Sequence, residues 1–338
     1  MPDDKPFFLA QNSGFDVATA TDELLHAQQN SAVAADSLTE TQYFGFCIPE
    51  ERIHGYGYLW CHPNLKVVSG GLFVWRGHKR SVVHGELCDY RDFMSDQVLK
   101  DDLHDYRLDN GYGVKIVVPL EYQVVTYSDA KRNNSVALDV RGLAPPVMYG
   151  DGKHFEQPVK VTGELVLRGN RYAVDCYSMR DRSWAKPRTE DQLPMPSVSW
   201  MQAVFNPEFS FCCSVLDQPS QNTELANTPL ALPDEKTLSG GWIRRNGRVG
   251  RIVTATKRVV RDAESRMPQA VDLDLTDEHG NRIQVHGSQI ASTTWVPWSN
   301  LFMPIVLMRW ECEGEVTHGD CQEGIWNDYL QLPMGAAK

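Results

Sequence analysis

The sequence predicts an all-β protein built from two antiparallel barrels or sandwiches, with few short helices. Three observations support this fold class. From about Thr41 onward, short segments alternate between apolar and polar residues with a period of two. These segments are rich in Val, Ile, Tyr, Phe and Trp, which suit a half-buried pleated surface. Strong turn sequences separate them, and the few helical patterns are too short to supply the crossover helices of a parallel sheet.

The expected strands follow this alternation in order along the chain. In the first half they are Thr41–Ile48, Gly55–Cys61, Val67–Trp75, Arg80–Leu87, Val114–Leu120, Tyr122–Ser128, Ser135–Arg141 and Val159–Leu167. In the second half they are Arg171–Tyr177, Phe209–Val215, Arg248–Thr256, Ala270–Leu275, Ile283–Ser288, Leu301–Trp310 and Cys321–Tyr329. Segments such as Asp109-Asn110-Gly111 and Arg245-Asn246-Gly247 supply residues that tolerate positive φ, as tight hairpins require.

Helices and boundaries are few. Thr21–Gln28 could form a short helix, and Tyr90–Leu103 could form a helix or a capping loop. Pro187–Pro196 is expected to be a crossing or a long loop, and Asp217–Lys236 a solvated connection or a lid on a barrel rim. A length of 338 residues accommodates two domains. We expect an N-terminal extension over residues 1–40, one β domain over 41–165 and a second over 166–338.

The charge and composition of the chain limit the classes of binding partner that we expect. The formal net charge of −11 disfavours nucleic acid and anionic membrane surfaces, which attract basic proteins. No apolar run is long enough to span a bilayer, and the first residues do not resemble a secretory signal, so a cytoplasmic location is expected. The eight cysteines form no CxxC pair and are expected to be reduced and mostly buried. A redox or metal role for the adjacent Cys212 and Cys213 is the less favoured alternative.

Common cofactor and nucleophile motifs are absent from the sequence. No GxGxxG opens a helix after a strand, and there is no P-loop, GxSxG elbow or HExxH. The ten histidines show no close metal-binding spacing, so a metal would need ligands from distant strands. We therefore expect no metal and no cofactor.

The segment MRDRSW, which ends with Trp184, is the most distinctive constellation. Asp181 could point into an apolar pocket, where burial would raise its pKa and a neighbouring cation such as Arg182 would lower it. It would then serve as a tunable acid or base. The alternative is a structural ion pair between Asp181 and Arg182 that closes a barrel end.

Three further groups of residues are candidates. His84 and Glu86 are two positions apart on an expected strand, so they share a face; they form a proton-handling pair if that face is interior and are solvated if it is not. Glu323 and Trp326 combine a carboxylate with an aromatic wall near the C-terminus, although such aromatics often only close a sheet. Trp184 and Arg182 are also expected to line the pocket beside Asp181. The other wall candidates are Tyr58, Trp60 and Trp75, in an aromatic, glycine-rich run whose alternative role is an ordinary core.

A resemblance to a known superfamily rests on several runs of sequence. They are ETQYFGFCIPE, GYGYLW, GGLFVW, DYRLDNGYGVKIVVPLE, HFEQPVKVTGELVL, YAVDCYSMRDRSW and RWECEGEVTHGDCQEG. Together they resemble the hydroxyneurosporene synthase (carotenoid hydratase)-like superfamily and, within it, bacterial tandem lipocalin-like proteins. The likeness covers nearly the whole chain after about Glu40. Its most specific part is Asp181-Arg182-Ser183-Trp184, but the family usually has Gly directly after the Trp, where this chain has Ala185.

The resemblance implies two lipocalin-like barrels packed side by side around a cavity for a hydrophobic molecule. In the superfamily the chemistry includes addition of water to C=C bonds, and related architectures assist cyclisations, all without a redox cofactor. The leading hypothesis is a cofactor-independent hydratase, dehydratase or isomerase acting on a terpenoid, a steroid or a similar apolar molecule. Asp181 would be the acid, His84 and Glu86 a relay, and Glu323 an alternative carboxylate. The alternatives are a non-catalytic carrier and a cyclase or pericyclase; the oligomeric state is open, with a homodimer as one option.

Overall fold

The computed structural model describes residues 15–26, 38–99, 102–148, 152–187 and 195–331. Its contacts divide the chain into two compact units. The first comprises Met1–Arg76 with Val83–Arg188, and the second comprises Gly77–Val82 with Thr189–Lys338. The expected division after residue 165 falls inside a strand whose hairpin partner belongs to the first unit, and the contacts place the division after Arg188 instead.

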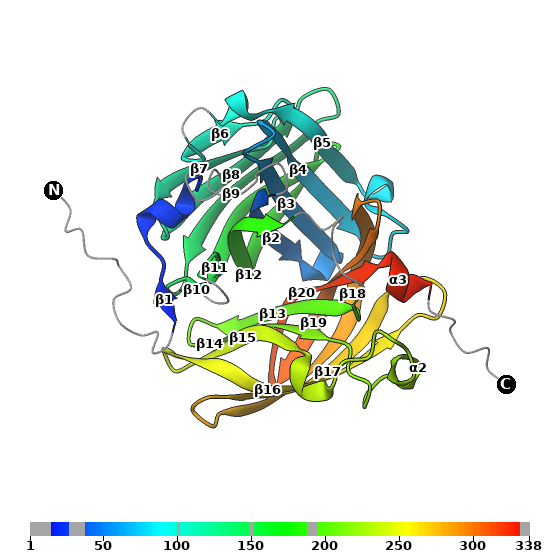
Figure 1. The fold of residues 1–338 in the computed structure, drawn as a ribbon. Coiled ribbons are helices and arrows are strands. Elements are labelled where there is room, and N and C mark those ends of the chain that lie inside the picture. Colours follow the sequence, from blue (N-terminus) through cyan, green and yellow to red (C-terminus); the bar gives the residue numbers. More distant parts are fainter. Residues whose placement is uncertain (1–14, 27–37, 100–101, 149–151, 188–194, 332–338) are drawn as a thin grey trace. The chain divides into compact units, whose positions relative to one another are not determined.

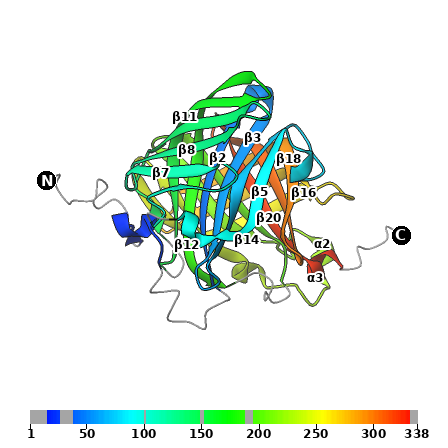
Figure 2. The same ribbon diagram turned by 90° about the horizontal axis from the view of Figure 1, so that it is seen from above.

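The first unit is one antiparallel sheet. Its strands are β1 (Asp16–Val17), β2 (Leu38–Ile48), β3 (Ile53–His62), β4 (Val67–Arg76), β5 (Leu87–Ser95), β6 (Asp105–Arg107), β7 (Gly113–Val118), β8 (Tyr122–Asp129), β9 (Asn134–Gly142), β10 (Val147–Met148), β11 (His154–Leu167) and β12 (Asn170–Pro187). The order is β5-β4-β3-β2-β12-β11-β9-β8-β7-β6, with β10 pairing with β1 and β11. In Figure 1 and in the perpendicular view of Figure 2, its long strands form a curved wall.

Short 3-10 helices connect the strands of this sheet. They are η1 (Ala20–Glu23), η3 (Pro49–Glu51), η4 (Val82–His84) and η5 (Asp96–Val98). The expected helix over Thr21–Gln28 is only the single turn η1 within the described residues. The segment Tyr90–Leu103 is not a helix, because its first half is the strand β5, which pairs with β4. Cross-strand pairing here outweighs the local helical pattern.

The second unit is a closed barrel. Its eight strands are β13 (Val198–Asn206), β14 (Phe209–Leu216), β15 (Leu238–Arg245), β16 (Arg248–Arg261), β17 (Pro268–Asp277), β18 (Arg282–Trp298), β19 (Leu301–Cys312) and β20 (Glu315–Trp326). Strand β13 closes the barrel on β20. The helices of this unit are α2 (Thr223–Ala226), η7 (Asp234–Lys236) and α3 (Asn327–Leu330). Of the expected loop Pro187–Pro196, residues 188–194 lie outside the described residues.

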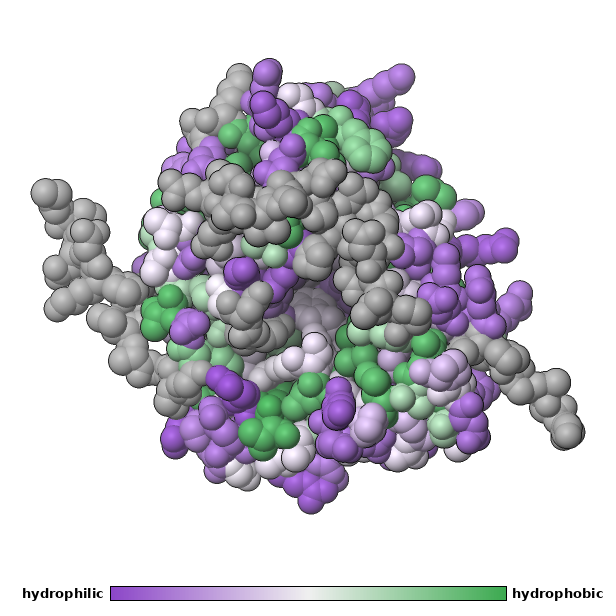
Figure 3. Space-filling model, in the orientation of Figure 1, coloured by the Kyte–Doolittle hydropathy of each residue, from purple (hydrophilic) through white to green (hydrophobic). Residues whose placement is uncertain are grey.

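The structure confirms the predicted all-β class, but it fills the interior of the second barrel. Alternate residues of its strands, such as Met201, Phe211, Val271 and Trp310, form one continuous apolar cluster. Packed apolar side chains therefore occupy the inside of this barrel, so it is not where the expected cavity for a hydrophobic molecule would lie. Figure 3 shows hydrophilic side chains over much of the visible surface, with the hydrophobic ones in small separate groups. None of the helices in the described residues has the length and hydropathy needed to cross a bilayer.

Two barrel strands, β13 and β15, are missing from the strands predicted from the sequence, and each omission has a local cause. Strand β15 contains Gly241, whose φ is +155° and whose added Cβ would come within 2.6 Å of the carbonyl oxygen of Cys212. The β14–β15 register shifts nearby, between Ser214 and Val215. A glycine with this conformation at a bulge hides the alternation that identifies a strand. Strand β13 directly follows the Pro-rich stretch.

The residue after Trp184 adopts the backbone conformation that a glycine favours. Ala185 has a φ of +51°, and the β12–β2 register shifts between Ser183 and Lys186. A Cβ in this left-handed region costs about 1 kcal/mol. Ala185 therefore stands at a bend where a glycine would be unstrained.

Replacing Ala185 with glycine is expected to raise the free energy of unfolding by about 0.5–1 kcal/mol, because it relieves this strain. Urea denaturation measures the change. Ala173 is a matched control, since it lies exposed on the same strand and is not among the positive-φ residues. Its replacement by glycine should lower stability by a similar amount. Loss of stability in the Ala185 variant would mean that its packing against the Trp184 cluster matters more than its strain.

Candidate functional site

One row of residues crosses six strands of the first sheet at the same level. The pairings join Glu156 to Asp181, Asp181 to Tyr43, Tyr43 to Tyr58, Tyr58 to Gly71, and Gly71 to Tyr90. Directly opposite residues of antiparallel strands project to the same face. We call this set the Asp181 row. It places two carboxyl groups and three phenols on one face.

A second row lies two residues along and adds hydroxyl groups. It joins His154, Ser183, Thr41, Trp60 and Ser69. The hydroxyl oxygens of Thr41 and Ser183 are 2.7 Å apart, and the Thr41 hydroxyl also hydrogen bonds with the phenol of Tyr58. A chain of hydroxyl groups therefore runs from Ser183 to Tyr58, beside Asp181.

Aromatic rings pack around the two rows. The ring centroids of Tyr56 and Tyr58 are 5.6 Å apart and stacked, and those of Tyr58 and Trp60 are 5.9 Å apart in an edge contact. The ring centroids of Tyr43 and Tyr56 are 4.6 Å apart. Such rings present apolar, electron-rich faces together with hydroxyl and indole donors. Burial raises the pKa of Tyr58, so its phenol stays protonated.

Asp181 is the chemically distinctive member of this face. Its side chain is half-buried, and it makes no hydrogen bond or ion pair within the part of the chain that the structure describes. Burial raises the pKa of Asp181 to about 7. His154 opposes this rise and the negative charge of Glu156 adds to it, while Arg182 and Arg180 lower the pKa from the other face. A carboxyl group with this pKa can give or take a proton near neutral pH.

Glu156 and His154 stand next to Asp181 and were not candidates in the sequence analysis. The Glu156 side chain is fully buried, and its Oε1 lies 3.2 Å from Nε2 of His154. Strand β11 begins at His154, whereas the sequence predicts a strand only from Val159. Pro158 is tolerated because it lies where the partner of β11 changes from β10 to β9. The alternation His-x-Glu before Pro158 is the signal that would have identified the pair.

The structure brings together three of the residues predicted from the sequence, namely Asp181, Tyr58 and Trp60. Trp75 lies farther along β4 on the same face, fully buried, with its ring centroid 4.6 Å from that of His54. It belongs to the core beyond the rows rather than to the group around Asp181.

Arg182 and Trp184 lie on the opposite face from Asp181. Arg182 donates to the carboxylate of Glu40 at 3.1 Å and to the carbonyl oxygen of Leu24 at 2.7 Å. Trp184 stacks on His26 with ring centroids 4.0 Å apart. The expectation that both line the pocket with Asp181 is wrong, because successive residues of a strand point to opposite faces. They fasten the N-terminal segment to the sheet.

The expected strand Arg80–Leu87 is not formed, so His84 and Glu86 do not share the face of a strand. His84 ends the 3-10 helix η4 and is exposed. Glu86 accepts a hydrogen bond from the backbone N–H of Arg76 at 2.7 Å. Strand β5 starts only at Leu87, after Gly85 and Glu86. The geometry therefore gives no support to this pair as a relay.

Glu323 lies inside the second unit in a saturated charge network. It accepts two hydrogen bonds from Arg261, at 2.8 and 2.7 Å, and one from Ser199 at 2.7 Å. Arg261 and Lys257 also contact Asp217, and despite its burial they hold the pKa of that carboxyl well below its usual range. These contacts hold the Glu323 carboxylate against Arg261 and Ser199 within the second unit.

Trp326 is buried three residues after Glu323 on the same strand, so the two project to opposite faces. They do not form the combined carboxylate and aromatic site that the sequence suggested. Both residues are structural parts of the second unit.

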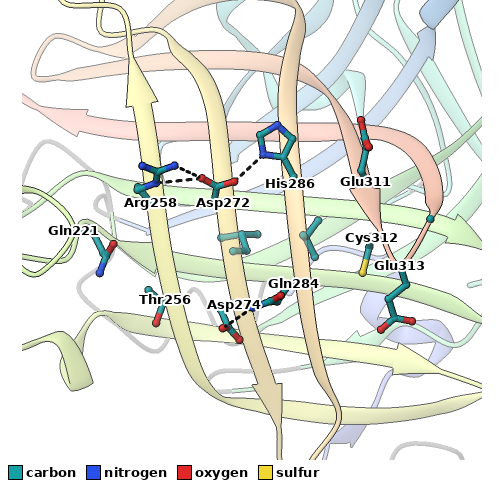
Figure 4. Close-up of a pocket in the computed structure, with 13 residues that line it drawn as sticks. Gln221, Thr256, Arg258, Asp272, Asp274, Gln284, His286, Glu311, Cys312 and Glu313 are labelled. Atoms are coloured by element: carbon teal, nitrogen blue, oxygen red, sulfur yellow. Dashed lines mark hydrogen bonds and ion pairs between the residues drawn. The ribbon is translucent and has the colours of Figure 1, made fainter.

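A groove of about 530 Å³ on the second unit is lined mainly by polar residues of β16, β17 and β18 (Figure 4). Arg258 and His286 both contact Asp272, at 2.8 and 2.7 Å, and all three side chains are more than 40% exposed. Solvent screens such ion pairs. Among the described residues, no group of three or more His, Cys, Asp or Glu side chains is arranged to hold a metal. The face around Asp181 is therefore the stronger candidate.

Comparison with known families identifies the chain. A family model described as a domain of unknown function, DUF7064, matches residues 19–328. The protein belongs to the DUF7064 family. A search of curated proteins finds no match. The match spans both units, so they are parts of one DUF7064 domain.

Two solved structures share the fold of this DUF7064 protein. An AttH-like protein from Nitrosomonas europaea is 9% identical with a TM-score of 0.53, and 94% of this chain and 99% of that one are covered. Kievitone hydratase from Nectria haematococca is 13% identical with a TM-score of 0.50, and the coverage is 96% and 99%. At such identities the likeness shows the fold alone. It confirms the lipocalin-like architecture, while the closer link to carotenoid hydratases stays a prediction.

Proposed function

We propose that this protein is a lyase of the hydratase or dehydratase type, which adds water to, or removes it from, a hydrophobic small molecule bound against the aromatic face of the first sheet. The observation that carries the proposal is Asp181, a half-buried carboxyl group without a hydrogen bond among the described residues, whose pKa is raised to about 7. The fold likeness to kievitone hydratase supports the same class of reaction. Terpenoids and steroids are the substrate classes we expect.

In the hydration direction, Asp181 donates its proton to one carbon of a C=C bond, and a cation develops on the other carbon. The rings of Tyr58, Trp60 and Tyr43 present their negative faces to this cation. Water then attacks the cation and releases a proton, which returns to Asp181. The polar pair of Glu156 and His154, whose side chains are 3.2 Å apart, lies next to it. Dehydration follows the same steps in reverse, with the departing hydroxyl protonated first.

Water labelled with ¹⁸O tests the reaction class. The full chain is incubated with terpenoid and steroid alkenes, and the extracts are analysed by mass spectrometry. We expect a product that has gained one labelled water, or exchange of label into an alcohol when the equilibrium favours the alkene. Binding without any mass change or exchange would identify a carrier, and an unlabelled product of unchanged mass would identify a cyclase or isomerase. Either outcome would overturn the proposal.

The pH dependence of kcat/KM for hydration follows from the proton on Asp181. Because the acid must be protonated, kcat/KM should be level at low pH and fall about tenfold per pH unit above about pH 7. Replacing Glu156 with glutamine removes a negative charge that helps to raise the pKa of Asp181, so the descending limb should move to lower pH. Glu164→Gln is a matched control, because Glu164 lies on the same strand in an exposed pair with Arg171. An unmoved limb in the Glu156 variant would contradict this assignment.

A further inference from the structure

Two cysteines face each other where β2 and β12 leave their regular pairing. The regular ladder of these strands ends at Phe44 and Arg180. Beyond it, the backbone N–H of Cys47 lies 3.4 Å from Sγ of Cys176, and the two thiols also hydrogen bond with each other. A Cβ added to Gly45 would lie 3.2 Å from Oγ of Ser178. Relative to the regular ladder, both contacts are shifted by one residue in the same direction. Cys47 is therefore opposite Cys176 on adjacent antiparallel strands.

Facing positions on antiparallel strands suit a disulfide. Opposite residues of antiparallel strands have Cα atoms about 4.5–5.5 Å apart, within the range of about 4.4–6.8 Å found for disulfides. Neither cysteine is in a disulfide in the structure, and the two residues are 5% and 7% exposed. Small oxidants are therefore better suited than large ones to reach them.

The surroundings of Cys176 also favour reaction. The hydrogen bond from Cys47 is the main cause that lowers the pKa of the Cys176 thiol, against the effect of burial, and Lys160 adds to the lowering. The thiolate is the form that attacks an oxidant. The other buried cysteines with a resolved shift, Cys61, Cys312 and Cys321, have raised pKa values. Cys176 is thus distinguished from them by its chemistry as well as its position.

We propose that Cys47 and Cys176 are a redox site that closes to a reversible disulfide when a peroxide is present. The Cys176 thiolate attacks one peroxide oxygen, the O–O bond breaks, and one water leaves after proton transfer, which produces a sulfenic acid. The Cys47 sulfur then attacks the sulfenic sulfur and displaces a second water. In sum, two thiols and one hydrogen peroxide yield one disulfide and two waters. A thiol reductant reverses the change.

The crosslink would join two cysteines that are 129 positions apart in sequence, one on β2 and one on β12. These strands carry Tyr43 and Asp181, so closing the disulfide should fix the spacing of the Asp181 row. This consequence rests on the proposed function and appears as a change in turnover on oxidation. The crosslink itself is measured without any activity, so failure of one proposal is distinguishable from failure of the other.

The test treats the reduced full chain with hydrogen peroxide and analyses it by mass spectrometry. We expect a loss of about 2 Da, a fall from eight free thiols by two, and a peptide that joins Cys47 to Cys176. The linked form should also melt at a higher temperature, because a long loop is closed. Cys47→Ala should abolish the link, while Cys88→Ser, which changes an exposed cysteine, should keep it. Eight remaining thiols, or a link elsewhere such as Cys212 to Cys213, would overturn the proposal.

Discussion

Replacing Asp181 with asparagine is expected to lower kcat/KM for the hydration reaction by about 10²–10⁴-fold, the usual contribution of a general acid. Asparagine matches the shape of aspartate but cannot donate a proton at neutral pH. The Asp181 side chain makes no hydrogen bond or ion pair in the described part of the chain, so the variant should fold normally. Steady-state kinetics on the folded variant, with circular dichroism as the check of folding, measures the effect.

Asp175→Asn is the matched control for this experiment. Asp175 lies on the same strand, 70% exposed, and pairs with Lys160 at the surface. Its replacement should leave kcat/KM within about twofold of the original value, since exposed ion pairs contribute little. If Asp181→Asn behaved like this control, a role for Asp181 in proton transfer would be ruled out.

Replacing Arg180 with methionine is expected to lower the free energy of unfolding by about 3–5 kcal/mol. Arg180 is fully buried and donates to both carboxylate oxygens of Glu23, at 3.0 and 2.6 Å, and to Gln157 at 2.7 Å. Without Arg180, the buried carboxylate of Glu23 would lose its cation. Urea denaturation measures the loss.

A double variant separates the cost of an unpartnered charge from the loss of packing. Glu23→Gln combined with Arg180→Met leaves no buried charge, so it should regain a large part of the lost stability. The backbone N–H of Leu120, which donates to Glu23 at 2.8 Å, would still find an amide oxygen. The matched control is Arg171→Met, because Arg171 pairs with Glu164 at the surface and its loss should cost no more than about 1 kcal/mol. A double variant as unstable as Arg180→Met would argue against an electrostatic cause.

The fold class could be predicted because period-two alternation and turn residues depend on neighbours in the sequence. Where long-range pairing decides, prediction failed. Tyr90 and its neighbours have a helical pattern, yet they pair with β4 as strand β5. Gly241 hides β15 because a bulge requires it. The segment around His84 has strand-forming valines, but it is a 3-10 turn.

The candidate site could be predicted only in part, for a similar reason. Asp181, Tyr58 and Trp60 were identified by residue type, but the face on which each lies depends on the partner strands. One position separates Asp181, which faces the phenols, from Arg182, which binds Glu40 on the other side. Glu323 pairs with Arg261, which is distant in sequence, so its residue type alone does not show this contact. Glu156 lies on this face because β11 continues through Pro158, which the local sequence does not predict.

The most direct test of the central claim is a measurement of the pKa of Asp181 itself. Carboxyl carbons of aspartate can be labelled with ¹³C and followed by NMR as a function of pH, with the Asp181→Asn variant assigning the signal. A pKa of about 7 is expected, because burial and the neighbouring Glu156 both disfavour the charged form. A value of about 4, as in a carboxyl group exposed to water, would contradict the role assigned to Asp181.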